Sequence, residues 1–128
     1  MHWSADDTVV GIETIIRTLH ARLPKTHIVL IGVLPSIRSE WVDAQTEATN
    51  KALAARFGGG ADPLVTYVDL GHLFRDASGH VEAGRFLDPH LTPPDPPLHP
   101  TAETQAKMAA AIEPIVARLL GDTPRAGL

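Results

Sequence analysis

The chain has 128 residues, of which 44% are hydrophobic and 20% are charged, and its formal net charge is −4. This composition indicates one globular domain with one core rather than a disordered chain. The acidic balance and the absence of a Lys/Arg cluster argue against nucleic acid and against a membrane surface as partners. Because the chain has no cysteine, disulfides, thiolate metal sites and cysteine nucleophiles are excluded.

The N-terminal segment predicts a helix over residues 4–23. Ser4 is a favourable N-cap, and Asp6 and Asp7 place negative charge in the first turn. Pro24 ends the helix. Apolar residues recur at helical spacing and form one stripe, which consists of Val9, Ile12, Ile16, Leu19 and Leu23.

A strand, a helix and a second strand are predicted next. Residues 28–34 are apolar apart from Gly32, which is typical of a strand buried on both faces of a parallel sheet. Residues 39–57 predict a helix that Ser39 caps and that closes at three glycines. Residues 64–70 predict the second strand, so the segment forms a βαβ unit with parallel strands.

The C-terminal part is predicted to be a long loop followed by one helix. Residues 71–94 have no clear period, and Gly79 marks a tight turn. The last helix is expected to begin at Thr101 and to kink or break at Pro114. Its apolar stripe consists of Met108, Ile112, Ile115 and Leu119.

Two parallel strands are too few for a stable sheet, because such strands need neighbours and helices on both faces. Further strands therefore come from a partner chain or from self-association, or the sequence is part of a larger domain. Alternatively, residues 85–91 add a short strand to the sheet.

His99 stands in an unusually stiff segment, "PPDPPLHPTAET". Pro96, Pro97 and Pro100 restrict the backbone around it, which lowers the entropy cost of holding the imidazole in place. A histidine that transfers protons in acyl transfer needs a fixed ring and a carboxylate that holds its tautomer, and Asp95 is the nearest acid. The alternative is a loop histidine that caps or packs the final helix.

The segment "LHPTAETQAKMAAAIEP" resembles the last conserved block of the SGNH hydrolases, also called GDSL-type esterases and lipases. The segments "HIVLIGVLP" and "VTYVDLGHLFRDASGHV" resemble two later strands of that family, and the helix from Ser4 resembles the one after its Asn-bearing loop. The resemblance implies an α/β fold, as a partial three-layer α/β/α sandwich of flavodoxin-like type with parallel strands. Residues 1–120 would be the C-terminal part of that domain, and residues 121–128 a flexible tail.

The resemblance also implies a carboxylic ester hydrolase with a Ser-His-Asp mechanism, which acts on a small-molecule ester and needs no cofactor or metal. His99 would be the base and acid, and Asp95 would orient it. Asp95 precedes His99 by four positions, whereas the family usually has three, and Pro96 occupies the expected place. Asp88 is the reserve candidate for the carboxylate.

The family's nucleophile and oxyanion-hole residues have no counterpart in this sequence. Its first block carries the serine, and its second and third carry a glycine and an asparagine. The four serines, Ser4, Ser36, Ser39 and Ser78, lie outside such a context. By resemblance Met1 falls just after the asparagine loop, so we expect a C-terminal portion that is inactive or nearly so alone. The start "MHWSADD" is not a signal peptide, but with a truncated N-terminus the compartment stays open; it is cytoplasmic if Met1 is the true start.

Two other interpretations were weighed. The chain could be a non-catalytic α/β interaction module, or a subunit that completes its sheet with a partner. His90 and His99 with Asp88 and Asp95 could suggest a metal site, but no histidine pair has the helical H-x-x-x-H spacing of a zinc site, and none is expected.

Overall fold

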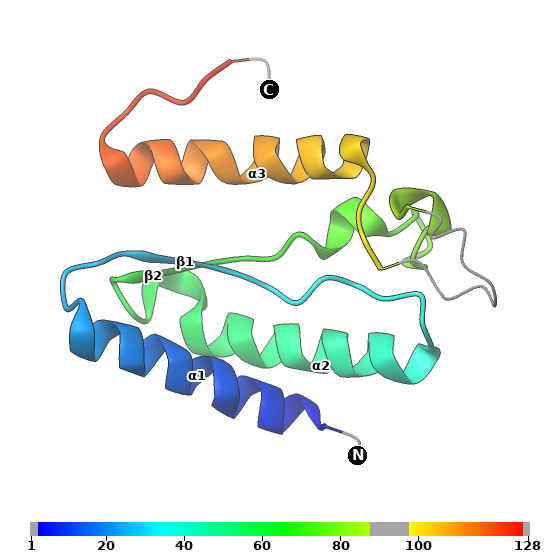
Figure 1. The fold of residues 1–128 in the computed structure, drawn as a ribbon, viewed down its shortest axis with the longest axis horizontal. Coiled ribbons are helices and arrows are strands. Elements are labelled where there is room, and N and C mark those ends of the chain that lie inside the picture. Colours follow the sequence, from blue (N-terminus) through cyan, green and yellow to red (C-terminus); the bar gives the residue numbers. More distant parts are fainter. Residues whose placement is uncertain (1–2, 88–97, 127–128) are drawn as a thin grey trace. The chain divides into compact units, whose positions relative to one another are not determined.

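The computed structural model describes residues 3–87 and 98–126. Figure 1 shows the helices and strands in chain order: α1 (Ala5–Arg22), β1 (Ile28–Ile31), α2 (Glu40–Phe57), β2 (Val65–Val68) and α3 (Ala102–Leu120). Three short 3-10 turns complete the order: η1 (Gly58–Gly60), η2 (Gly71–Phe74) and η3 (Ala83–Arg85). The predicted α/β class with parallel strands is confirmed.

The chain divides into two compact units, which are described separately. The sheet unit consists of Met1–Val33 and Ala44–Asp69, and the helix unit consists of Leu34–Asp43 and Leu70–Leu128.

The sheet unit contains the predicted βαβ arrangement. β1 and β2 pair in parallel, with Ile28 opposite Val65 and Ile31 opposite Val68. Alternate residues of a strand share a face of the sheet, and one face of this sheet packs against α1 and α2. The core consists of Ile16, Leu53, Phe57 and Val65, with Val9, Ile12, Ile28, Leu30 and Tyr67 packed against it.

The predicted helix starts of α1 and α2 are confirmed. The Ser4 hydroxyl accepts a hydrogen bond from the Asp7 N–H at 3.1 Å, and the Asp7 carboxylate accepts one from the Ser4 N–H, which completes a capping box. The Ser39 hydroxyl accepts from the Val42 N–H at 3.1 Å at the start of α2. After α2, Gly59 adopts φ +65°, a conformation that glycine tolerates best.

Both strands are shorter than the sequence predicts. β1 ends at Ile31 rather than at residue 34, and beyond this end the Asn50 side chain binds both backbone groups of Val33. β2 begins at Val65 because the Leu64 N–H turns to the Asp62 carboxylate, at 2.9 Å. Near these strand ends, side chains rather than a neighbouring strand bind the backbone.

The first half of the helix unit is a compact loop. The predicted turn at Gly79 is confirmed, with φ +86° and a bond of 3.0 Å from its N–H to the Asp76 carbonyl. Arg75 donates two hydrogen bonds to the Asp43 carboxylate, at 2.7 and 2.8 Å, and a third to the Gly79 carbonyl at 2.9 Å. Because both side chains of the ion pair are mostly shielded from solvent, the pair ties this turn to the first turn of α2.

Of the kink or break predicted at Pro114, the break does not occur, because α3 runs as one helix from Ala102 to Leu120. A proline inside a helix removes one hydrogen bond, but here both helix ends are well satisfied. Thr101 caps the start, and Gly121 in the left-handed conformation bonds to the carbonyls of Ala117 and Arg118.

Within the described residues Phe86 forms an isolated antiparallel bridge with Pro100, so residues 85–87 do not extend the sheet, and residues 88–91 lie outside the description. Among the described helices, none is long and apolar enough to cross a bilayer.

Candidate active site

His99 lies two residues before Thr101, the N-cap of α3, and it is exposed. Its backbone carbonyl accepts a hydrogen bond from the Leu87 N–H at 2.7 Å. Two residues later the Thr101 N–H donates to the Arg85 carbonyl at 3.0 Å. These two bonds flank the Phe86–Pro100 bridge and hold His99 against residues 85–87, in a structure that we call the His99 clamp.

The His99 clamp rests on buried aromatic side chains. Phe86 is only 6% exposed, and its ring centroid lies 5.3 Å from that of Phe74, which is fully buried. The two rings are tilted by 38°, an arrangement that adds to the stabilisation from burial alone. The backbone next to His99 is therefore anchored in the core of the helix unit.

The first turn of α3 fixes the other end of the clamp. The Thr101 hydroxyl accepts from the Thr104 N–H at 3.2 Å and lies 2.9 Å from the Thr104 hydroxyl, which is nearly fully buried. The Gln105 side-chain amide donates to the Pro100 carbonyl at 3.0 Å. The predicted N-cap at Thr101 is thus confirmed.

The same turn carries charge on its exposed side. Lys107 donates a hydrogen bond of 2.7 Å to Glu103, and this bond, together with the charge of Lys107, lowers the pKa of the Glu103 carboxyl. Arg85 lies 3.9 Å from the same carboxylate and lowers that pKa further. Glu103 is therefore a negative group at the N-terminus of α3, where its charge interacts favourably with the helix dipole.

The acids expected to orient His99, Asp95 and Asp88, lie outside the described residues, as does His90. Both carboxylates therefore remain predictions as partners of His99. Over residues 3–87 and 98–126, no three His, Asp or Glu side chains gather in a group that could hold a metal ion.

Each of the four serines has a local structural role. Ser4 and Ser39 cap helices, and the Ser36 hydroxyl accepts from the Arg38 N–H at 3.2 Å. Ser78 lies in the Gly79 turn, where its N–H donates to the Asp76 carboxylate at 2.8 Å. The absence of a nucleophile motif from this chain stays a prediction from the sequence.

A buried polar cluster, which the sequence patterns did not predict, lies at the end of β1. The Asn50 amide accepts from the Val33 N–H and donates to the Val33 carbonyl, both at 2.8 Å. The Tyr67 hydroxyl donates to the Asn50 carbonyl at 3.2 Å, and burial raises the pKa of Tyr67 to about 12, with a smaller effect from the charge of Asp69. A Cβ at Gly32 would lie 2.8 Å from the Tyr67 hydroxyl, so the cluster needs glycine there.

A signal for this cluster was present in the sequence. The buried face of α2 contains polar residues at helical spacing among apolar ones: Thr46, Thr49, Asn50, Leu53 and Phe57. Buried polar side chains need hydrogen-bond partners, so an asparagine on this face predicts a specific tertiary contact.

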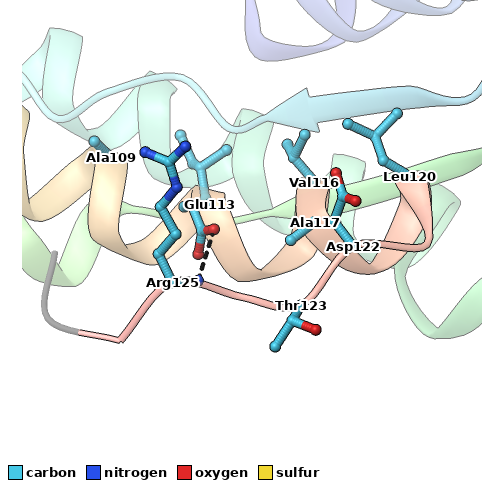
Figure 2. Close-up of a pocket in the computed structure, with 9 residues that line it drawn as sticks. Ala109, Glu113, Val116, Ala117, Leu120, Asp122, Thr123 and Arg125 are labelled. Atoms are coloured by element: carbon cyan, nitrogen blue, oxygen red, sulfur yellow. Dashed lines mark hydrogen bonds between the residues drawn. The ribbon is translucent and has the colours of Figure 1, made fainter.

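A groove of about 720 Å³ lies along α3 and the chain after it (Figure 2). Ile112, Val116 and Leu120 supply its apolar lining, and the Arg125 N–H donates to the Glu113 carboxylate at 2.9 Å across it. The lining includes none of the residues expected to catalyse ester hydrolysis.

The sequence profile of the GDSL-like Lipase/Acylhydrolase family matches residues 1–107, a range that includes Asp95 and His99. The chain belongs to this family. The matched range ends inside α3, so it covers the sheet unit, the loop of the helix unit and the His99 clamp.

The fold of this GDSL-like family member is similar to that of a solved structure described as "a putative platelet activating factor" from Streptococcus pneumoniae, with a TM-score of 0.65 over 88% of the chain. The two sequences are 20% identical, so this likeness concerns the fold alone. The chain spans 51% of the length of that structure. A comparison with curated proteins found no match.

Proposed function

We propose that this chain supplies the general base of a carboxylic ester hydrolase, and that His99 is that base. The observation that carries the proposal is the family match over residues 1–107, together with the clamp that holds the His99 backbone beside α3. In acyl transfer a neutral imidazole takes the proton of a serine hydroxyl and then returns it to the leaving alcohol. An exposed ring on an anchored backbone suits this task.

Asp95 is proposed to orient His99, with Asp88 in reserve. A carboxylate that accepts from the imidazole Nδ1–H holds the reactive tautomer and stabilises the imidazolium that forms. Two variants of an active protein, Asp95→Asn and Asp88→Asn, separate the candidates. We expect Asp95→Asn to lose nearly as much activity as His99→Ala, whereas near-normal activity of Asp95→Asn would reject Asp95.

The nucleophile and the oxyanion-hole donors are proposed to lie outside this chain. Ser4, Ser36, Ser39 and Ser78 have local roles in caps and turns, and loss of even one oxyanion donor typically slows an enzyme by about 10²–10³-fold. The chain alone is therefore expected to be inactive or nearly so. A small-molecule ester is the proposed substrate of the complete enzyme.

The outer edge of β1 is proposed as the place where the rest of the fold joins the sheet. The Ile28 N–H bonds to the Leu64 carbonyl just before β2, and the Gly32 N–H bonds to the Val68 carbonyl in β2, at 2.8 and 2.9 Å. The backbone groups of Val29 and Ile31 therefore face the opposite edge. Residues 28–37 contain no charged side chain that would oppose pairing, and Ile31 is 38% exposed. The chain spans 51% of the length of the similar structure, which supports the proposal that the complete fold is larger than this chain.

Amide hydrogen exchange tests this edge in the chain and in a longer protein that carries the remaining half. The Val29 and Ile31 amides should exchange quickly in the chain alone and become protected in the longer protein, while Gly32 is protected in both. If Val29 and Ile31 become protected in the chain alone, and only at high protein concentration, the result would favour self-association. Fast exchange of both amides in the longer protein would reject the proposal.

The catalytic proposal is tested in a longer protein, encoded by an extended reading frame, in which this chain is joined to a segment that carries the nucleophile. An alkyl fluorophosphonate should label one serine, and His99→Ala should slow labelling by about 10²–10⁴-fold, the usual contribution of a general base. The matched control is His72→Ala, which removes another exposed histidine of the helix unit. Equal labelling of the parent and His99→Ala would reject His99 as base, and absence of any labelled serine would favour a non-catalytic module.

A further inference from the structure

The backbone next to His99 is held from two directions. From one side, residues 85–87 bond to the His99 carbonyl and to the Thr101 N–H, at 2.7 and 3.0 Å. From the other side, the Gln105 amide donates to the Pro100 carbonyl at 3.0 Å. Because proline has no N–H, this carbonyl is the only backbone hydrogen-bonding group that Pro100 has.

The peptide units on both sides of Pro100 are therefore fixed. The unit before Pro100 is held through the His99 carbonyl, and the unit after it is held by Gln105 and by Arg85. Over the described residues, no side chain hydrogen-bonds the His99 imidazole, so the backbone determines the direction in which the ring leaves the chain. If the hydrogen bonds on either side of Pro100 were lost, the direction of the His99 ring would vary.

Gln105 is itself anchored in the first turn of α3. Its N–H donates to the Thr101 carbonyl at 2.9 Å, and the capping contacts between Thr101 and Thr104 stabilise the same turn. The side chain of Gln105 is exposed, so its removal opens no cavity in the core. The contact to Pro100 is thus separable from the packing of the helix.

We infer that Gln105 is a positioning residue, whose amide fixes the Pro100 carbonyl and thereby the exit angle of His99. The inference rests on the proposed role of His99 as the base, because that role makes the angle matter for catalysis. Gln105 itself touches no reacting atom in this arrangement. A purely structural role for Gln105, as an ordinary polar residue of α3, predicts different results in the following test.

The test uses the full chain, labelled for NMR, and the variant Gln105→Glu. A carboxylate cannot donate to the Pro100 carbonyl, but a negative charge in the first turn favours the helix, so the melting temperature should stay unchanged. We expect the Leu87 and Thr101 amides to exchange about 2- to 10-fold faster, the range for loss of one net hydrogen bond. The His99 Cε1–H resonance should move toward the position of an unstructured histidine.

Two further variants make the test decisive. Gln105→Lys restores a donor within reach of the Pro100 carbonyl and should recover the slow exchange and the His99 resonance. Lys107→Gln removes the exposed pair with Glu103 in the same turn and should leave both readouts unchanged. Unchanged exchange in Gln105→Glu, no recovery in Gln105→Lys, or an equal effect of Lys107→Gln would each overturn the inference.

These readouts need no ester hydrolysis, so the two proposals can fail separately. If Gln105 does not hold the clamp, fluorophosphonate labelling can still depend on His99. If labelling does not depend on His99, the exchange data still show whether Gln105 fixes the backbone.

Discussion

At the scale of single residues, Asn50 does for Val33 what a neighbouring strand does elsewhere in a sheet. Its side-chain amide has one donor and one acceptor, the same pair that a peptide group presents, and it bonds to both backbone groups of Val33 at 2.8 Å. Asn50 is only 7% exposed, so a lost partner leaves a buried polar group unpaired. Such a group typically costs about 1–3 kcal/mol.

The variant Asn50→Asp tests this contact, because it keeps the size of the side chain and removes its donor. A carboxylate would also face the Val33 carbonyl, so we expect the free energy of unfolding to fall by about 2 kcal/mol or more, measured by urea denaturation. Gln45→Glu is the matched control on the same helix. Gln45 accepts from the Ala5 N–H, at 2.9 Å, through an oxygen that glutamate keeps, so this change should stay within about 0.5 kcal/mol; equal losses would contradict the account.

Tyr67 provides a prediction about pH, and it is the only tyrosine in the chain. Burial raises the pKa of its phenol to about 12 in the folded protein, above the value of about 10 for an exposed phenol. This linkage stabilises the fold below pH 10 and is lost as the pH rises from about 10 to 12. Ultraviolet titration of the phenolate in the folded chain should give a midpoint near 12.

The control for this titration is Asp69→Asn. The charge of Asp69 is the smaller cause of the raised pKa, so its removal should lower the Tyr67 midpoint only slightly. A midpoint near 10 in the folded parent, or a return to 10 in Asp69→Asn, would show that burial is not the main cause.

At the scale of elements, α3 tolerates a proline in its interior. Pro114 cannot donate to the carbonyl one turn earlier, and proline costs about 3 kcal/mol relative to alanine in a helix interior. The helix persists because Thr101 and Gly121 satisfy its ends. Natural helices therefore carry local costs that their caps and packing offset.

We expect Pro114→Ala to raise the free energy of unfolding by about 1–3 kcal/mol, since it restores a hydrogen bond and helix propensity. Thermal or urea unfolding measures the change. Ala106→Gly, at an exposed position of the same helix, calibrates the scale and should lower stability by about 1 kcal/mol. A loss of stability in Pro114→Ala would mean that the proline fits a contact which alanine cannot make.

The elements that sequence rules could predict are those fixed by local chemistry. Ser4, Ser39 and Thr101 mark helix starts because a cap acts within three residues of itself, and Gly79 marks its turn for the same reason. The strand ends were not predictable in this way. β1 stops where Asn50, seventeen residues further along the chain, takes the Val33 backbone.

The candidate site likewise has parts that local sequence patterns predict and parts that they do not. The proline-rich approach and the cap identified His99 and the start of α3 from the sequence. The support beneath His99 comes from Phe86 and Leu87, which no local pattern connects to it. Its proposed carboxylate partners, Asp95 and Asp88, remain predictions from motif and resemblance.

At the scale of the whole molecule, this member of the GDSL-like family contains a βαβ unit and the helix α3, and it spans 51% of the length of a similar solved structure. Two parallel strands expose one backbone edge at β1, and parallel sheets are normally covered on both sides. The proposed function places the base in this half and the nucleophile in the other. On this account the two halves are separately incomplete in fold and in chemistry.

The most direct test is hydrolysis of p-nitrophenyl acetate by the purified full chain, measured beside His99→Ala. Exposed histidines hydrolyse this ester slowly without a triad, so the difference between the two proteins is the informative quantity. The account predicts equal rates at background, because the chain supplies the base without a nucleophile. Rapid turnover by the parent that His99→Ala abolishes would contradict it, since a nucleophile would then have to lie within these 128 residues.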